Sequence, residues 1–414
     1  MKNKVFCPAP FLHQYVNVNN HGHKLCCMSK QISKMDKNLS VQENMEKFWV
    51  SDEIKEIRQN FLDNKWPSAC EWYCGKYEKE QVYEESYRYN FLDRYKDIDY
   101  KEHELNVETG NKFNKPIDLD IRPGNTCNLK CRSCTGIWSN TIQKEVKANK
   151  QLQNTYYDTG SQYSQLDNST IDLSNVRSLK MSGGETLVDP DVYTFLQNAV
   201  ENGYAKNIEL HLLTNGTYMP KRIIDVLSKF KSLIVNVSID AVGSLEEYLR
   251  TGTDWEQQKQ IFEKILSIPN LKKCGINSVI QITGIFGLQD LIDFAYDNKY
   301  TENKKYRGVS FLPIVDPEFL SIGLLTKQHK KEVLDIIEKN KKSIMFDKFV
   351  NQIKPVISEV NRGFDNRQKL LQEGKQHINN LDQVRNTNIV SLQPELAEYY
   401  DCLLYTSPSP RDSR

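Results

Sequence analysis

The sequence lacks the features that mark membrane and secreted proteins. No stretch approaches the roughly eighteen apolar residues of a transmembrane helix, and the N-terminal residues contain no continuous apolar run typical of a signal peptide. Neither sign of charge dominates, because 55 basic residues accompany 54 acidic ones and the net charge is +1. No basic tract carries interleaved aromatic residues. We therefore expect a soluble, cytoplasmic protein with neither a membrane nor a nucleic acid as partner.

Cysteine, by contrast, is more frequent than packing requires. The chain has ten cysteines, and most of them lie in short groups separated by long stretches without cysteine. In a cytoplasmic protein such groups favour metal or iron–sulfur ligation over disulfide bonds. Cys274, which stands alone, is interpreted as a small buried apolar residue. The grouped residues are Cys7, Cys26, Cys27, Cys70, Cys74, Cys127, Cys131 and Cys134.

The middle of the chain alternates between strand-like and helix-like patterns. A helical pattern begins at Pro190, for example, with apolar residues at i, i+3, i+4 and i+7. Six alternations of strand and helix predict an α/β fold in which parallel strands form a partial (βα)6 TIM-like barrel. The six predicted strands are 117–121, 178–181, 208–213, 233–239, 278–285 and 308–314.

Composition divides the chain into four segments. Residues 1–110 are polar, rich in tyrosine and cysteine, and include one predicted helix over 45–64. Residues 117–325 contain the alternating units, and a long insert at 140–176 is predicted to be a helix followed by a surface loop. Residues 326–401 are polar and helical, and we expect them to pack back on the barrel. Residues 402–414 resemble the translation of a sequencing adapter, in which case Cys402 does not belong to the native protein. An ordinary disordered tail is the alternative.

A loop with three closely spaced cysteines follows the first predicted strand. Cys127, Cys131 and Cys134 have the spacing C-X3-C-X2-C. Three thiolates hold three irons of a [4Fe–4S] cubane and leave the fourth iron open to a chelating ligand. A structural zinc site takes four protein ligands, so this loop is one ligand short of such a site.

This loop resembles the signature of the radical S-adenosylmethionine (SAM) superfamily. The resemblance implies that the open iron binds SAM, and that electron transfer cleaves SAM to a 5′-deoxyadenosyl radical. Cys127, Cys131 and Cys134 are then the catalytic cluster ligands. The family commonly has an aromatic residue before the third cysteine, whereas this chain has Ser133. The difference places the adenine contacts in question, but not the cluster.

Later motifs resemble the same family in the same order. The segment Ser182-Gly183-Gly184-Glu185 ends the second predicted strand and is similar to the family's GGE motif, which binds the amino group of the methionine part of SAM. Its two glycines allow the backbone to approach a ligand closely. The resemblance also implies polar contacts to SAM from residues that follow later strands, namely Asn215, Ser238, Asp240 and Arg250.

These later residues have simple structural alternatives. Asn215 precedes a glycine and is typical of a tight turn, and Asp240 fits the N-cap of a helix. Arg250 is also compatible with a solvated surface position. Gln281 and Thr283, on the fifth predicted strand, are further candidates for the adenine site.

The N-terminal cysteines resemble the auxiliary-cluster (twitch or SPASM) pattern of radical SAM maturases. The spacing C-X14-G-X4-C runs from Cys7 to Cys27, and Cys70 and Cys74 supply two more thiolates. Four thiolates would bind a second [4Fe–4S] cluster. Cys26 is the alternative to its neighbour Cys27, and a structural zinc ion is the alternative to iron. This module follows the barrel in most maturases, whereas here it precedes the barrel.

The sequence therefore predicts a radical SAM enzyme that abstracts hydrogen from a substrate. A peptide or protein is the first candidate substrate, because relatives with auxiliary clusters often modify peptides. A dehydrogenase or epimerase of a small molecule or carbohydrate is the second possibility. The third is a non-catalytic iron–sulfur or zinc protein, and the Gly-Gly-Glu motif after the cysteine loop argues against it. The reaction requires a reductant such as flavodoxin or ferredoxin.

Overall fold

The structure is a computed structural model that describes residues 5–17, 22–81, 83, 86–97, 105–159 and 171–400. The tail predicted from Cys402 lies outside these residues, and so does part of the insert at 140–176. Within the described ranges, no helix combines the length and apolarity needed to cross a membrane.

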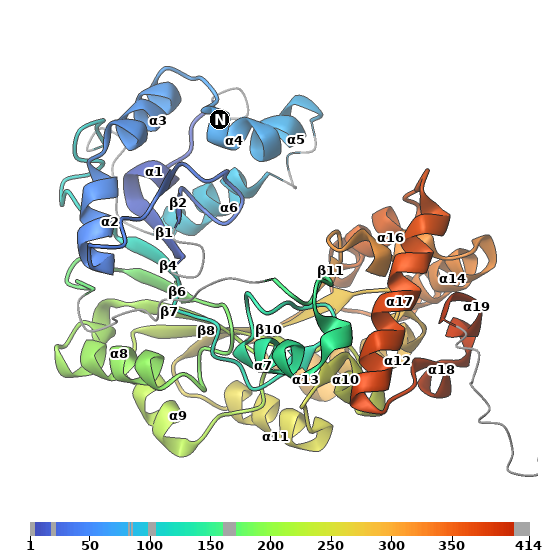
Figure 1. Cartoon of the computed structure of the whole chain (residues 1–414). Coiled ribbons are helices and arrows are strands. Elements are labelled where there is room, and N and C mark those ends of the chain that lie inside the picture. The colour runs from blue at the N-terminus through green and yellow to red at the C-terminus, as the bar shows by residue number, and fades with distance from the viewer. Residues whose placement is uncertain are drawn as a thin grey trace, which may run out of the picture.

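One sheet of nine strands organises the molecule, in the order β11-β10-β8-β7-β6-β4-β1-β2-β3. Six of these strands follow one another in chain order, and each pairs in parallel with the next. This arrangement confirms the predicted partial barrel, which Figure 1 shows in side view. The six strands are β4 (Asp118–Arg122), β6 (Ser178–Met181), β7 (Glu209–Thr214), β8 (Ser232–Ser238), β10 (Leu271–Ile280) and β11 (Tyr306–Pro313).

The N-terminal residues extend this same sheet. Strand β1 (His13–Asn17) pairs in parallel with β4, and β2 (Gly22–Lys24) and β3 (Ser33–Lys34) continue the sheet in antiparallel pairing. Around these strands lie short helices, which form the blue part of Figure 1. They are α1 (Ala9–Leu12), α2 (Val41–Trp49), α3 (Asp52–Leu62), α4 (Ser68–Cys70), the π-helix η1 (Glu71–Gly75), α5 (Lys76–Lys79) and α6 (Tyr87–Arg94).

Two predicted elements differ from those observed. The single helix predicted over 45–64 is two helices, α2 and α3. Ser51 is the N-cap of α3, because its backbone is extended and its hydroxyl accepts a hydrogen bond from the backbone N–H of Ile54. The fifth strand runs over Leu271–Ile280 instead of 278–285. Its start was missed because two exposed lysines interrupt the apolar pattern, and the chain turns after Ile280.

Helices cover one face of the parallel sheet, and their apolar sides form the main core with alternate strand residues. Leu210 and Leu212 of β7, for instance, are fully buried in this core. The side chains at the alternate positions of each strand point to the opposite, concave face of the sheet. The helices are α8 (Pro190–Glu201), α9 (Lys221–Leu227), α10 (Gly243–Leu249), α11 (Trp255–Leu266), α12 (Leu288–Ala295) and α13 (Asn298–Thr301). Helix α7 (Asn140–Ala148) instead packs in a separate, smaller apolar cluster.

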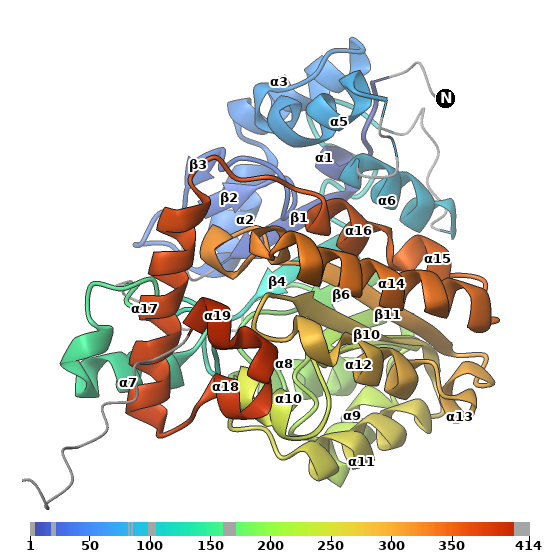
Figure 2. The same ribbon diagram turned by 90° about the vertical axis from the view of Figure 1, so that its right-hand side faces the viewer.

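The C-terminal segment is helical, as predicted, and packs on the last strand of the barrel through α15 and α16. Figure 2 views this side of the molecule, with the long helix α17 standing beside α7. The helices of the segment are α14 (Lys327–Ser343), α15 (Phe349–Gln352), α16 (Lys354–Val360), α17 (Arg367–Arg385), α18 (Ile389–Leu392) and α19 (Ala397–Tyr400).

Candidate active site

The three-cysteine loop follows β4, at the carboxyl-terminal edge of the parallel strands. Cys127, Cys131 and Cys134 are all half-buried, and none of them is in a disulfide. Burial is the main cause that raises the pKa of the Cys127 thiol, to about 12, and the nearby Cys131 thiol adds to the effect. Burial also raises the pKa of Cys131 and Cys134. These thiols are therefore neutral at pH 7 without a metal, and binding a cluster must displace their protons.

Local hydrogen bonds fix the first of these cysteines. The backbone N–H of Cys127 donates to Oδ1 of Asn140, 3.2 Å away, and the Thr141 hydroxyl donates to the carbonyl of Cys127. The backbone N–H of Leu129 donates to the Cys127 sulfur over 3.5 Å. Hydrogen bonds of this last kind stabilise a thiolate and tune the potential of a bound cluster.

The Gly-Gly-Glu segment packs directly against the start of the cysteine loop. Gly184 has φ +53°, and a Cβ atom at this position would lie 2.5 Å from the carbonyl oxygen of Thr126. The backbone N–H of Glu185 donates to the same oxygen over 2.7 Å. Only glycine allows this approach, so the segment and the loop form one unit. The ring of Trp138, which the sequence did not single out, lies beside Gly183.

The Glu185 carboxylate joins two strand ends. It is 1% exposed and accepts hydrogen bonds from the Thr214 hydroxyl (2.8 Å), the backbone N–H of Leu187 (3.1 Å) and the backbone N–H of Asn215. Burial raises its pKa, and these hydrogen bonds oppose the rise. Ser182 is also buried, and its hydroxyl has no hydrogen-bond partner among the described residues. A ligand could therefore use the Ser182 hydroxyl without breaking an existing bond.

Asn215 serves both as a turn residue and as a contact to the cysteine loop. Its Oδ1 accepts hydrogen bonds from the backbone and the hydroxyl of Thr217, at 2.9 and 2.7 Å. Its Nδ2 donates to Oδ1 of Asn128, 2.9 Å away. Ser238, at the end of β8, is half-buried, and its carbonyl accepts a hydrogen bond from Gln258.

Arg250 is buried, so its interpretation as a surface residue is wrong. The residue is 9% exposed, and its backbone pairs with Cys131 where β9 (Arg250–Thr251) meets β5 (Lys130–Cys131). Its Nη1 forms an ion pair with Oδ2 of Asp240 at 3.2 Å. The other oxygen of Asp240 accepts from the backbone N–H of Val279 at 2.8 Å. Asp240 does not cap a helix, because α10 has Val242 at its N-cap.

Sequence reasoning missed Glu246, the second carboxylate beside Arg250. It is fully buried and accepts hydrogen bonds from the backbone N–H groups of Asp240 and Ala241, both at 2.9 Å. Its Oε1 lies 3.5 Å from Nε of Arg250. Burial, and then the charge of Asp240, raise its pKa to about 8. The i,i+4 spacing of a glutamate and an arginine on a predicted helix was the available signal.

Gln281 and Thr283 lie in the turn after β10 and not on the strand. Both are fully buried, and the Thr283 hydroxyl donates to Oε1 of Gln281 over 3.0 Å. Nε2 of Gln281 has no hydrogen-bond partner among the described residues. Together with Asp240 and Gly284, Gln281 lines a small hollow at this edge of the sheet.

The N-terminal cysteines form a second group. Cys7 and Cys26 are buried in one apolar cluster, and Cys70 packs against it. A backbone hydrogen bond of 2.9 Å from Lys30 to Ala69 ties the loop after Cys26 to α4. Burial is the main cause that raises the pKa of Cys26, the thiol of the adjacent Cys27 comes next, and the thiols of Cys70 and Cys7 contribute less. Cys74 contributes in the same way to the raised pKa of Cys7 and Cys70.

Cys27 lies toward different neighbours. Burial is the main cause that raises the pKa of Tyr15 and of Tyr87, and the nearby thiol of Cys27 adds to the rise in both. The Cys27 thiol also lies near Arg122 of β4. The structure therefore groups Cys26 with Cys7, Cys70 and Cys74, whereas the sequence spacing favoured Cys27. Within the described ranges, no three or more His, Cys, Asp or Glu side chains are placed to share a single metal ion. The ligands of a cubane bind separate irons.

Charged residues of β4 lie on the concave face, and the sequence analysis missed them. Asp118 of β4 is fully buried and accepts from His13 (2.8 Å), Tyr95 (2.6 Å) and Arg94 (3.1 Å). Although burial alone would raise its pKa, His13 and Arg94 hold the pKa of Asp118 well below its usual range. Two residues along β4, Asp120 pairs with Lys180 at 3.2 Å and with Arg122 at 3.3 Å. The polar alternation in the sequence DLDIR was the available signal.

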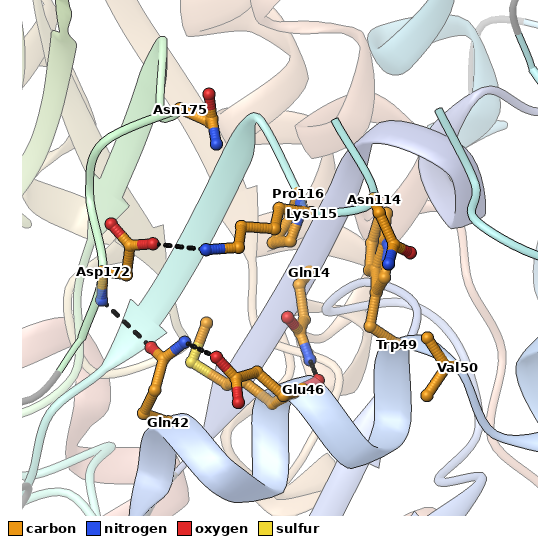
Figure 3. Close-up of a pocket in the computed structure, with 11 residues that line it drawn as sticks. Gln14, Gln42, Glu46, Trp49, Val50, Asn114, Lys115, Pro116, Asp172 and Asn175 are labelled. Carbon is orange, nitrogen blue, oxygen red and sulfur yellow. Dashed lines mark hydrogen bonds and ion pairs between the residues drawn. The ribbon is translucent and has the colours of Figure 1, made fainter. Parts of the chain in front are cut away.

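A separate pocket lies at the other edge of the sheet, where the strands begin (Figure 3). It has a volume of about 250 Å³ and lies between α2 and the segments that lead into β4 and β6. Gln14 and Trp49 form part of its wall, and an ion pair of 2.7 Å between Lys115 and Asp172 lies at its side. None of the predicted site residues lines it.

Comparison with known proteins agrees with this geometry. Residues 121–292 match the family model of the radical SAM superfamily. A probable GTP 3′,8-cyclase of Methanococcus vannielii is 27% identical over 242 residues, which cover 58% of this chain and 71% of the cyclase. The antilisterial bacteriocin subtilosin biosynthesis protein AlbA of Bacillus subtilis is 26% identical over 145 residues, or 34% of this chain and 28% of AlbA.

Solved structures are more distant. The crystal structure of SuiB from Streptococcus suis is 17% identical, with a TM-score of 0.34 over 77% of this chain and 65% of SuiB. The structure of SuiB bound to the precursor peptide SuiA aligns similarly, with a TM-score of 0.32 over 78% of this chain and 64% of that one. The family match covers the cysteine loop, the Gly-Gly-Glu segment and Arg250. Residues 121–292, which carry the cysteine loop, therefore match the radical SAM superfamily.

Proposed function

We propose that this chain binds a [4Fe–4S] cluster through Cys127, Cys131 and Cys134, cleaves SAM reductively and abstracts hydrogen from a peptide or protein. One observation carries the proposal. The cysteine loop packs against the Gly-Gly-Glu segment at Gly184 and pairs through Cys131 with Arg250. Three thiols, a close backbone approach and a buried cation thus meet at the carboxyl-terminal edge of parallel strands, where βα barrels place their active sites.

The residues at this edge fit a zwitterionic ligand. The cluster and SAM supply the chemistry, because one electron from the reduced cluster cleaves SAM to a 5′-deoxyadenosyl radical. Arg250 offers a buried positive charge to the SAM carboxylate, and Asp240 and Glu246 hold that guanidinium in place. The unpartnered Ser182 hydroxyl and the Glu185 carboxylate lie where an ammonium group can bind. Gln281 offers a free amide N–H toward the adenine side.

The same proposal includes an auxiliary [4Fe–4S] cluster in the N-terminal region. Its ligands are Cys7, Cys70 and Cys74 together with Cys26, which shares their apolar surroundings. Four thiolates saturate a cubane, so this cluster would transfer electrons or anchor the substrate and would not bind SAM. A reductant such as flavodoxin or ferredoxin would supply the electron for the first cluster.

The bacteriocin biosynthesis relative supports a peptide substrate. The GTP 3′,8-cyclase relative supports a second candidate, a small-molecule substrate, because its similarity extends over more of this chain. The charged concave face, with Asp120, Lys180 and Arg122, suits a polar substrate of either class.

The test starts from anaerobic reconstitution of the full chain with iron and sulfide. We expect about eight irons per chain for two clusters. A content of about four irons and one zinc would instead indicate a structural zinc site in place of the auxiliary cluster. Dithionite and SAM should then yield 5′-deoxyadenosine, and Cys131→Ser should abolish this product. A fully loaded chain that forms no 5′-deoxyadenosine would contradict the proposal. Candidate peptides and nucleotides added to the same assay separate the two substrate classes, because only a substrate accelerates SAM cleavage.

A further inference from the structure

The C-terminal segment contacts the cysteine loop directly, although more than two hundred residues separate them in the sequence. We propose that helix α17, together with Tyr157, forms a clamp that fixes the end of the loop, from Cys131 to Cys134, and so positions the cluster ligands. The Gly-Gly-Glu segment contacts the start of the loop at Thr126, so the two supports act at opposite ends. The inference rests on the proposed function, because it concerns the same cluster loop.

Two aromatic side chains donate hydrogen bonds to consecutive carbonyls of the loop. The Tyr157 hydroxyl donates to the carbonyl of Cys131, and Nε2 of His377 donates to the carbonyl of Arg132 over 3.1 Å. The two rings lie 5.4 Å apart. Burial lowers the pKa of His377 to about 4, so the ring is a neutral donor at pH 7. A neutral donor adds no charge beside the cluster loop.

Arg132 ties the loop to α17 from the other direction. Its side chain is fully buried, and its Nη2 forms an ion pair with Oδ1 of Asp382 on α17 at 2.8 Å. The same guanidinium donates to the carbonyl of Tyr248 over 3.0 Å and lies 3.5 Å from the centre of that ring. A buried charge with such partners holds one geometry, because losing any partner leaves the charge desolvated.

Arg385, at the end of α17, joins the two halves of the clamp. It binds Glu145 of α7 through two nitrogens, at 3.2 and 2.7 Å. Its Nη2 also donates to the Tyr157 hydroxyl over 3.1 Å, and this bond leaves the hydroxyl proton for the Cys131 carbonyl. Glu145 in turn pairs with Lys130, the residue before Cys131, at 2.7 Å.

Apolar packing completes the contact. Leu381 of α17 is fully buried in a small cluster to which α7 and the segment after it contribute, and Cys134 packs against this cluster. Its other members are Ile142, Val146, Leu152 and Tyr157. The third cysteine therefore packs against a cluster to which both α17 and Tyr157 contribute. These residues are positioning residues, because none of them is a cluster ligand.

The test measures how firmly the loop is held, in two independent ways. In the cluster-free chain, hydrogen exchange of the amides of Arg132 and Cys134 should accelerate about three- to tenfold in Tyr157→Phe and in His377→Phe, as expected for the loss of one hydrogen bond. In the reconstituted chain, the same variants should release iron to a chelator faster by a similar factor. The electron paramagnetic resonance signal of the reduced cluster should also broaden.

Matched variants separate positioning from general damage. Gln376→Ala changes an exposed residue beside His377 on the same helix and should leave both rates unchanged. His377→Gln retains an N–H donor and should restore the rates toward those of the unmodified chain. Wild-type exchange and wild-type iron release in both phenylalanine variants would overturn the clamp. An unmodified chain that takes up no cluster would overturn the proposed function instead, and the exchange measurement would still decide whether α17 holds the loop.

Discussion

Replacing Arg250 with leucine should lower the free energy of unfolding of the cluster-free chain by about 3–5 kcal/mol, the usual cost of removing one partner of a buried ion pair. The side chain of Arg250 is 10% exposed, and that of Asp240, which it meets at 3.2 Å, is 1% exposed. The substitution leaves the Asp240 carboxylate buried without a counter-charge. Glu246 contributes less to the loss, because its pKa of about 8 keeps most of it protonated at neutral pH.

The assay is urea denaturation at pH 7, followed by a double-mutant cycle. Asp240→Asn in the leucine background should recover part of the loss, because it removes the uncompensated charge, with a coupling of about 1–3 kcal/mol. Lys65→Leu serves as the control, since it removes an exposed ion pair with Asp63 and should cost less than about 1 kcal/mol. A loss below about 1 kcal/mol for Arg250→Leu, or strict additivity with Asp240→Asn, would refute the reasoning.

Three further changes test other parts of the site. Gly184→Ala should lower the free energy of unfolding by about 2–4 kcal/mol and weaken SAM binding in a titration, because the new methyl group would lie 2.5 Å from a backbone oxygen. Gly243 also has a positive φ, but a methyl group there would meet no atom within 4 Å, so the control Gly243→Ala should cost only about 1 kcal/mol. Cys26→Ser should lower the iron content of the reconstituted chain from about eight to about four, whereas Cys27→Ser should leave it at about eight. Burial lowers the pKa of His211 from 6.5 to about 4, so the folded chain binds a proton at this imidazole more weakly than the unfolded chain does. About 3 kcal/mol of the free energy of unfolding should therefore be lost as the pH falls from 6.5 to 4. His211→Gln should flatten that loss in urea titrations at successive pH values, and an unchanged pH profile would contradict the assignment.

Patterns local in the sequence predicted the fold well. Alternating strands and helices placed five of the six barrel strands to within a few residues, and the helix at Pro190 begins where its pattern begins. The fifth strand was misplaced because Lys272 and Lys273 are exposed, which hides the strand that they belong to. The helix over 45–64 was predicted as one element because its apolar spacing continues across the serine that separates α2 from α3.

Contacts between distant residues could not be predicted in the same way. The i,i+4 spacing of Glu246 and Arg250 indicates that the two side chains can pair, but it does not distinguish a surface pair from one buried beside Asp240. The hydrogen bond from His377 to the carbonyl of Arg132 spans 245 residues, and no local pattern encodes it. Resemblance identified the residues that we propose as cofactor ligands, whereas only the fold identified the residues that contact them.

The pairing of β1 with β4 limits how this protein can be divided. Residues 13–17 are bonded in register to residues 118–122, and the buried bond between His13 and Asp118 crosses the same pair. The cysteines near the N-terminus thus stand on the edge of the barrel sheet itself. A fragment cut near residue 110 would keep the pairing of β1 with β2 but expose the edge of β1 that pairs with β4, and the barrel left behind would lose the strand beside β4. The N-terminal cysteine region is therefore not a module that can be transferred to another barrel, because the pairing of β1 with β4 would have to be transferred with it.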